Sequence, residues 1–253
     1  MNYLGVYTLF KRELIRVKEV WRQAVLAPAV TNLLFLLIFG VAIADRVQTF
    51  GDYGYMTVLI PGLVVMGLMI NSMQNPLFSI VISKYTNNIG DLLKLPLTGF
   101  ELAISYIAGG IIRGAIVGIV TLIVGLFFAP VPFAHPLLII LFSILIGGTF
   151  ASIGAILGVI SDDFDKANVI PTFIITPLIY LGGVFYSVQT LPGLFQTISK
   201  FNPILYMVDG FRYSFLGIGD APLALSLGIT TVLFAIFFGI VSWIFHTGYK
   251  LKT

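Results

Sequence analysis

The chain has 253 residues, of which 58% are hydrophobic and only 10% are charged, with a net charge of +3 and no cysteine. Soluble domains carry about 25% charged residues, so this composition excludes a single soluble core and predicts a protein that resides in a lipid bilayer. The lack of cysteine excludes disulfides and thiolate chemistry, and the two histidines are too far apart in the chain to suggest a metal cluster.

The first segment, residues 1–23, is basic and amphipathic. Arg12 and Arg16 share one face of the expected helix with Glu19. Spacings of four and three residues place an apolar and aromatic stripe on the other face: Tyr3, Tyr7, Phe10, Leu14, Val17 and Trp21. We predict an interfacial helix on the inner leaflet, because the segment lacks the apolar region of a cleavable signal peptide. Its basic face either completes a simple anchor or also contacts a cytoplasmic partner.

Six apolar stretches follow, each of about the length needed to cross the hydrocarbon core. The first has 21 residues without a charge, which corresponds to about 31 Å of helix. Lipid offers no partner to exposed backbone groups, so each stretch should be helical. We expect an all-α polytopic membrane protein in which residues 1–253 form one transmembrane domain. The expected spans are 24–44, 56–83, 103–129, 136–160, 168–187 and 223–245.

The positive charges predict the orientation. Ten of the 14 Lys and Arg residues lie in the N-terminal segment, in the loops after the second and fourth spans, or in the C-terminal tail. With six spans these segments share one side of the membrane. An excess of Lys and Arg marks the cytoplasmic side, so both termini should be cytoplasmic.

The loop between the second and third spans, residues 84–102, contains a charged amphipathic block that reads DLLKLPLTGFEL from Asp91. Asp91, Leu92, Leu93 and Pro96 form a compact unit that can bury its leucines only against another protein. We predict that this cytoplasmic unit docks on a partner, from which the chain receives work.

Residues 188–222 are external in this topology and contain two amphipathic pieces of about ten residues each. Each piece could cross only about half of the hydrocarbon core, so we predict a re-entrant helical hairpin between the fifth and sixth spans. A plain surface loop is the alternative. Asp209 and Arg212 are three residues apart and therefore neighbours on one helical face, where they form either a local ion pair or a gate contact. Tyr206 and Arg212 could each bridge the polar exterior and an apolar groove.

Arg113 lies inside the third span, in the sequence GGIIRGA. A charged side chain at this depth is costly and usually faces protein or water. Arg113 therefore contacts substrate or a partner helix along a translocation path, or it snorkels or pairs with carbonyl groups at a helix interface. Glycines recur every fourth residue in the third and fourth spans, which predicts close helix packing: Gly110, Gly114 and Gly118, then Gly154 and Gly158.

Several function classes have no matching motif in the sequence. It contains no Gly-x-x-x-x-Gly-Lys-Ser/Thr phosphate loop, no Ser/His/Asp set and no His-Glu-x-x-His motif. The apolar stretches also lack the mid-membrane carboxylate that a proton-driven carrier would need. The residues alone leave three hypotheses: a permease driven by a partner ATPase, a stand-alone channel or secondary carrier, and an integral-membrane enzyme that modifies lipids.

Four segments carry a family resemblance. The internal segment NNIGDLLKLPL spans 87–97, PLIYLGGVFYS spans 177–187, FNPILY spans 201–206 and DGFRY spans 209–213. Together with the order of the predicted elements, they resemble the type-two permeases of ATP-binding-cassette (ABC) exporters, in particular the YadH-like inner-membrane permeases. The resemblance covers nearly the whole chain. One departure is Asp91, which stands where many members of the family have Glu.

The resemblance implies a permease in the bacterial inner membrane, paired as a homodimer or with a like subunit, and bound to two cytoplasmic ABC ATPase subunits. ATP and Mg would bind to those subunits, so this chain would hold no cofactor, no metal and no nucleic acid. Substrate would leave by alternating access or through a transient channel. The residues expected to couple the ATPase are Asp91, Leu92, Leu93, Pro96, Arg12 and Arg16, and those expected along the path or gate are Arg113, Tyr206, Asp209 and Arg212.

Overall fold

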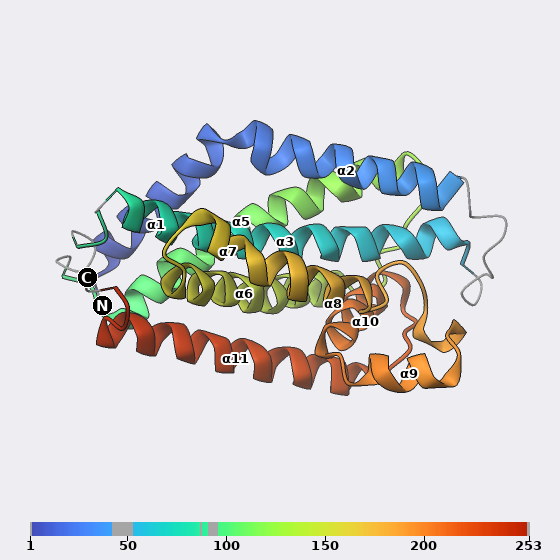
Figure 1. Cartoon of the computed structure of the whole chain (residues 1–253). Helices are drawn as coiled ribbons and strands as arrows, with labels where there is room; N and C mark the ends of the chain where they lie inside the picture. Colours follow the sequence, from blue (N-terminus) through green and yellow to red (C-terminus); the bar gives the residue numbers. More distant parts are fainter. Residues whose placement is uncertain (1, 42–52, 87, 91–95, 252–253) are drawn as a thin grey trace.

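The computed structural model of the chain describes residues 2–41, 53–86, 88–90 and 96–251, which form helices and no β-strand (Figure 1). The first half contains α1 (Tyr3–Glu19), the π-helical turn η1 (Arg22–Leu26), α2 (Ala27–Phe35), the π-helical turn η2 (Leu36–Val41), α3 (Tyr55–Tyr85) and α5 (Gly99–Leu126). The second half contains α6 (Pro136–Ile160), α7 (Phe164–Ile170), the π-helical turn η4 (Pro171–Ile175), α8 (Thr176–Tyr180), the 3-10 turn η5 (Val188–Thr190), α9 (Gly193–Lys200), α10 (Pro203–Leu216) and α11 (Leu223–Thr247).

Five helices of the described residues are long and apolar enough to cross a membrane: Arg22–Gly40, Tyr55–Tyr85, Gly99–Leu126, Pro136–Ile160 and Leu223–Thr247. They overlap the first four predicted spans and the sixth. The chain is therefore an all-helical polytopic membrane protein.

The predicted fifth span, 168–187, does not form one long helix. The chain is helical only from residue 164 to residue 180, through α7, η4 and α8, which corresponds to about 25 Å. Turns follow, and Gly183 adopts a φ of +80°, a left-handed conformation that ends a helix and favours glycine. The expected end at residue 187 is wrong, because hydropathy continues past the point where the backbone turns.

Two of the π-helical turns come directly before a proline. The amide of Ala27 donates to the carbonyl of Arg22, one residue before Pro28, and the amide of Thr176 donates to the carbonyl of Pro171, one residue before Pro177. Proline lacks an amide hydrogen, and its ring would clash with the carbonyl four residues earlier in a regular helix. A wider turn relieves that clash, so the sequence accounts for both irregularities.

α3 forms the centre of the bundle. In the most apolar 18-residue segment of α3, 89% of the residues are buried within the chain. In the corresponding segment of α11, only 17% of the residues are buried. α5 and α6 approach α3 closely because both carry glycine at the contact. A Cβ atom at Gly154 would lie 2.0 Å from the carbonyl oxygen of Met73, and one at Gly114 would lie 2.6 Å from that of Leu68. The predicted glycine faces are thus packing surfaces, while α11 leaves much of its surface to lipid or to another subunit.

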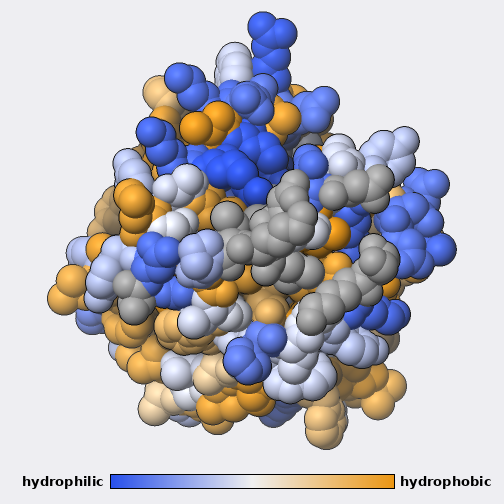
Figure 2. All heavy atoms as spheres, turned by 90° about the vertical axis from the view of Figure 1, so that its left-hand side faces the viewer, coloured by the Kyte–Doolittle hydropathy of each residue, from blue (hydrophilic) through white to orange (hydrophobic). Residues whose placement is uncertain are grey.

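Both chain termini lie at one end of the bundle, next to α1, and the hairpin of α9 and α10 lies at the other end (Figure 1). α7, η4 and α8 lead from the first end towards the second. Hydrophilic side chains gather on the face at the terminal end, mainly along its upper and right-hand parts, whereas hydrophobic side chains dominate lower down (Figure 2).

Candidate functional site

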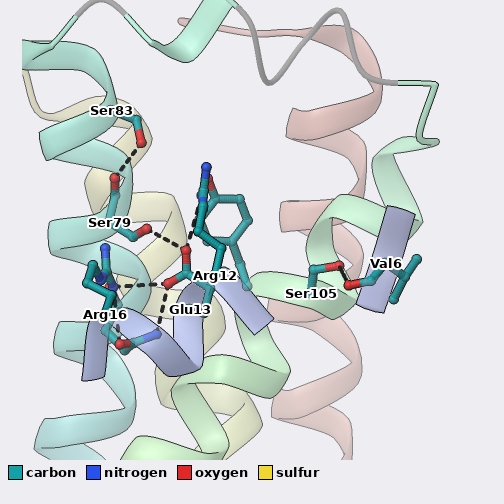
Figure 3. Close-up of polar contacts among 9 residues, drawn as sticks. Val6, Arg12, Glu13, Arg16, Ser79, Ser83 and Ser105 are labelled. Carbon is teal, nitrogen blue, oxygen red and sulfur yellow. Dashed lines mark hydrogen bonds and ion pairs between the residues drawn. The ribbon is translucent and has the colours of Figure 1, made fainter. Parts of the chain in front are cut away.

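A buried polar cluster joins α1 to α3 and α5 at the terminal end of the bundle. We call it the Glu13 cluster, and it consists of Arg12, Glu13, Arg16, Asn75, Ser79 and Tyr106 (Figure 3). Glu13 lies at its centre and is only 1% exposed. Its two carboxylate oxygens accept hydrogen bonds from two residues of α3: from Ser79 Oγ at 2.8 Å and from Asn75 Nδ2 at 3.2 Å.

Two arginines form ion pairs with Glu13, which leaves the three side chains with a net charge of +1. Arg12 Nη2 lies 3.1 Å from Oε1 of Glu13, and Arg16 Nη2 lies 3.0 Å from Oε2. Arg12 also donates to the hydroxyl of Tyr106 on α5 at 3.0 Å, and Arg16 donates to the backbone carbonyl of Asn75 at 2.5 Å. Burial lowers the pKa of Arg16, whereas the neighbouring Glu13 carboxylate raises it. A buried carboxylate is tolerated only when paired in this way, so the cluster holds α1 to the spans.

The inward face of α1 differs from the sequence-based expectation. Leu9, Glu13 and Val17 are its buried residues, and Arg16 turns towards Asn75 of α3. Tyr3, Tyr7 and Trp21 of the predicted stripe point away from the bundle and are exposed. The prediction of Arg16 on an outward basic face is wrong because the carboxylate of Glu13 faces α3 and the arginine pairs with it. Whether Arg12 and Arg16 couple to an ATPase stays a prediction.

A pocket of about 380 Å³ opens beside the Glu13 cluster, between the end of α1, η1, α3, α5 and α7. Its polar lining consists of Arg16, Gln23, Gln74 and Arg113, and its apolar lining includes Phe78 and Phe164. The rings of Phe78 and Phe164 stack with their centroids 6.4 Å apart. The pocket therefore combines cationic and amide donors with an aromatic wall.

Arg113 reaches this pocket from the middle of α5. Its side chain is 8% exposed, and its buried Nε has no hydrogen-bond partner in the described part of the chain. No described carboxylate forms an ion pair with it. In contrast to Arg16, the Arg113 guanidinium is thus a buried cation whose charge is not neutralised by a described residue.

The predicted docking unit lies mostly outside the described residues, which exclude Asp91, Leu92 and Leu93. Pro96 is described and exposed, and its carbonyl accepts a hydrogen bond from Asn2 Nδ2 at 3.4 Å. Thr98 then starts α5 with a capping box, because its side chain accepts from the Glu101 amide while Glu101 accepts from the Thr98 amide at 2.7 Å. The other oxygen of Glu101 accepts from the Asn2 amide at 2.5 Å. The start of α1 is therefore fixed to the end of the internal segment.

The residues predicted to form the outer gate are packed inside the hairpin end of the molecule. Asp209 accepts hydrogen bonds from the amides of Asp220 at 2.6 Å and Ala221 at 3.0 Å. Burial raises the pKa of Asp209, and these two amides act in the opposite direction. Arg212 is 2% exposed and donates to the carbonyl of Gly183 at 2.5 Å. Both side chains are buried and tie the loops at 183 and 220 to α10.

Tyr206 is the more accessible of the predicted gate residues. It is half-buried, and its hydroxyl donates to the carbonyl of Lys200 at the end of α9, at 3.0 Å. This bond holds the two helices of the hairpin together. The gate role of Tyr206, Asp209 and Arg212 stays a prediction.

The sequence-based predictions missed several residues of the Glu13 cluster and of the pocket beside it. Glu13, Asn75, Ser79, Gln23 and Gln74 were not singled out. Their signal is weak, since single polar residues in apolar stretches are common and only the fold shows which of them meet. The spacing of Leu9, Glu13 and Val17 at every fourth residue was the available indication that a carboxylate lies on a buried face. Among the described residues no three His, Cys, Asp or Glu side chains group as a metal site.

Comparison with known proteins identifies the family of this chain. The profile of the family described as ABC-2 type transporter matches residues 5–216. The chain is 36% identical over 243 residues to the inner membrane transport permease YadH of Escherichia coli K12, which covers 96% of this chain and 94% of that protein. It is also 25% identical over 224 residues to nodulation protein J of Rhizobium leguminosarum bv. viciae, with 84% of each protein covered.

Proposed function

The chain belongs to the ABC-2 type transporter family, and from this premise we propose that it is the permease subunit of an ABC exporter, driven by a separate ATPase. It is a membrane subunit of a transporter and resides in a bacterial inner membrane. Export is the proposed direction. Hydrolysis of ATP, with Mg, is assigned to the partner because this sequence contains no phosphate-binding loop.

The observation that carries the coupling part of the proposal is the Glu13 cluster. α1 lies at the hydrophilic end of the bundle and is hydrogen bonded directly to α3 and α5. A displacement of α1 by an ATPase would therefore act on the central helix of the bundle without an intervening loop. The bond between Asn2 and Glu101 extends this connection to the internal segment.

We place the docking contact on the internal segment itself. Leu92 and Leu93 would fill an apolar cleft of the ATPase, and Asp91 would meet its polar rim. Burial of a leucine is worth roughly 1.5–3 kcal/mol, less the ordering cost of association. Pro96 and the capped start of α5 would hold this unit at the membrane surface.

The remaining assignments follow the family. The chain crosses the membrane six times, with residues 164–180 as the short fifth crossing, and α9 and α10 form a re-entrant hairpin over the exit. Two copies, or this chain and a like subunit, enclose the substrate path. The exposed surfaces of α11 and of Arg22–Gly40 are available to lipid or to the second copy.

Site-directed crosslinking tests this function. The chain lacks cysteine, so Leu92→Cys introduces a single reactive group in the internal segment, and Leu194→Cys introduces one in α9. With a co-expressed ATPase, a crosslinker at residue 92 should capture that subunit, and one at residue 194 should not. The complex should hydrolyse ATP while the isolated chain does not.

The double variant Leu92→Ser/Leu93→Ser provides the functional readout. It should insert normally but lose ATPase binding, or hydrolyse ATP without transport. Normal transport by this variant, together with no capture at residue 92, would remove the internal segment from the mechanism. Capture of the ATPase from residue 194 would overturn the orientation.

A further inference from the structure

The pocket beside the Glu13 cluster contains a positive charge that no described carboxylate pairs with. Arg113 is 8% exposed, and its Nε is buried without a hydrogen bond among the described residues. A buried charge without a partner is costly, most of all within a membrane. The planar guanidinium group is well suited to bind a carboxylate or phosphate through two parallel hydrogen bonds.

The rest of the pocket favours an anion over any other ligand. Arg16, Gln23 and Gln74 line it together with Arg113, and all four side chains carry N–H donors. No carboxylate is among its lining residues. Glu13 lies 3.0 Å from Arg16 but also pairs with Arg12, so these three side chains keep a net charge of +1, and Arg113 adds a second positive charge that is not paired with a described carboxylate.

The apolar wall sets the second requirement on the ligand. Phe78, Ile82 and Phe164 line the pocket on the side of α3 and α7, and the stacked rings of Phe78 and Phe164 form a flat surface. The volume of about 380 Å³ is at the lower end of the range for small-molecule sites. It suits a single anionic head group followed by an apolar chain, because a small inorganic anion would leave the aromatic wall without a contact.

We propose that this pocket binds the anionic head group of an amphiphile, a phosphate or carboxylate on an apolar chain, with Arg113 as the principal charge contact. The binding itself does not depend on an ATPase. Only the identification of the amphiphile as transported cargo rests on the proposed function.

Equilibrium binding to the isolated chain in a neutral detergent tests the site. Dodecyl phosphate is the probe, with dodecanol and inorganic phosphate as the uncharged and chainless comparisons. Arg113→Gln should weaken binding of dodecyl phosphate by about tenfold or more, a loss equivalent to about 1.4 kcal/mol per factor of ten. Arg113→Lys should retain part of the affinity. Arg22→Gln is the matched control, because it removes one exposed positive charge that does not line the pocket, and it should change the affinity less than twofold.

Equal affinity of the wild type and Arg113→Gln overturns the proposal. So does equal affinity for dodecanol, which would indicate only an apolar groove, or for inorganic phosphate, which would indicate only an anion site. Should Arg113→Gln fail to fold, Ile82→Cys in the cysteine-free chain gives a second measurement. Dodecyl phosphate should slow its reaction with a maleimide and dodecanol should not, and a lack of protection would also overturn the site.

Two further measurements distinguish transported cargo from a bilayer lipid as the source of the ligand. If the amphiphile is cargo, dodecyl phosphate should stimulate ATP hydrolysis by the complex with its ATPase. If it is a bilayer lipid, native mass spectrometry should detect phosphatidylglycerol retained by the wild type and lost from Arg113→Gln, without stimulation. A complex that hydrolyses ATP while the isolated chain binds no dodecyl phosphate would overturn the site and leave the proposed function standing.

Discussion

At the scale of single residues, this protein depends on charges buried where the surrounding helices are apolar. Glu13 is fully enclosed by partners: two arginines on its own helix and two donors on α3. Arg212 is enclosed at the opposite end and bonds to the backbone of the loop after α8. Arg113 lies between these ends and is the buried cation without a described counter-charge. The first two stabilise the fold, and the third is the candidate for ligand binding.

Replacement of Glu13 should detach α1 from the spans. Glu13→Ala removes the carboxylate but leaves Arg16 near α3, and breaking a buried pair costs on the order of 3 kcal/mol. For a chain of this size, that loss should lower the apparent melting temperature of the purified protein by roughly 6–12 °C. Glu19→Ala removes an exposed glutamate of the same helix and should change the melting temperature little. Equal melting of the two variants would mean that the Glu13 cluster does not hold α1.

Arg212→Ala should reduce the stability of the protein, and a loss of transport should be a consequence of that reduced stability. The substitution leaves the carbonyl of Gly183 without its donor, and an unsatisfied buried group costs about 1–3 kcal/mol in addition to the lost packing. We expect a lower yield and earlier thermal unfolding than for Lys200→Ala, which truncates an exposed cation of the same hairpin. If Arg212→Ala unfolds like the wild type and yet transports nothing at equal expression, the side chain acts as a gate.

At the scale of elements, the long helices are positioned by the absence of side chains at their contacts. α6 lies against α3 at Gly154, and α5 lies against it at Gly114. In a membrane the helices gain little from hydrophobic association, so close packing supplies much of the attraction between them. The π-helical turns before Pro28 and Pro177 keep one backbone hydrogen bond just ahead of each proline, from Ala27 to Arg22 and from Thr176 to Pro171.

Gly154→Ala tests this packing against a matched control. The new methyl group would lie 2.0 Å from the carbonyl oxygen of Met73, so α6 and α3 must separate, at a cost of roughly 1–3 kcal/mol or more. Gly228→Ala in α11 places a methyl group where no atom lies within 4 Å, and alanine favours a helix by about 1 kcal/mol. Thermal unfolding in detergent should show a clear loss for the first variant and none for the second. A neutral Gly154→Ala would mean that α6 is not held at this distance.

At the scale of the whole molecule, the bundle has two chemically different ends. The termini and the Glu13 cluster occupy the hydrophilic end, and the α9–α10 hairpin occupies the other. The proposed coupling to an ATPase at one face and release of cargo at the other would require this polarity. The proposed position of the α9–α10 hairpin on the outer side of the membrane requires that the short helical stretch of residues 164–180 crosses it.

Labelling of single cysteines from outside intact cells tests the six-crossing topology. Lys200→Cys in α9 should react with a membrane-impermeant maleimide, and Lys166→Cys in α7 should react only after the membrane is opened. Both positions are exposed, and the native chain has no cysteine that would contribute background. Protection of both residues until the membrane is opened would show that residues 164–180 do not cross, and the chain would then have five spans.

The sequence alone determined the environment and most of the long elements. Hydropathy and charge counts are local quantities, so apolar runs with at most one charge identify α3, α5, α6 and α11 within a few residues, and glycine spacing identifies the contact faces of α5 and α6. The family segments are likewise contiguous in the chain. The same local signal failed at residues 181–187, where an apolar sequence turns at Gly183 instead of continuing as a helix.

The polar contacts were decided only by the tertiary structure. Glu13 meets Asn75 and Ser79 across separations of 62 and 66 residues, and Arg212 meets Gly183 across 29. No periodicity in the sequence links such positions, because each depends on which faces of two helices are brought together. For the same reason Arg16, which the sequence places on a basic face, turns inward to a carboxylate, while Arg113 lines a pocket and pairs with no carboxylate in the described part of the chain. Hydrophobicity along the chain selects the helices, but the pairing of buried charges is set by their arrangement in space.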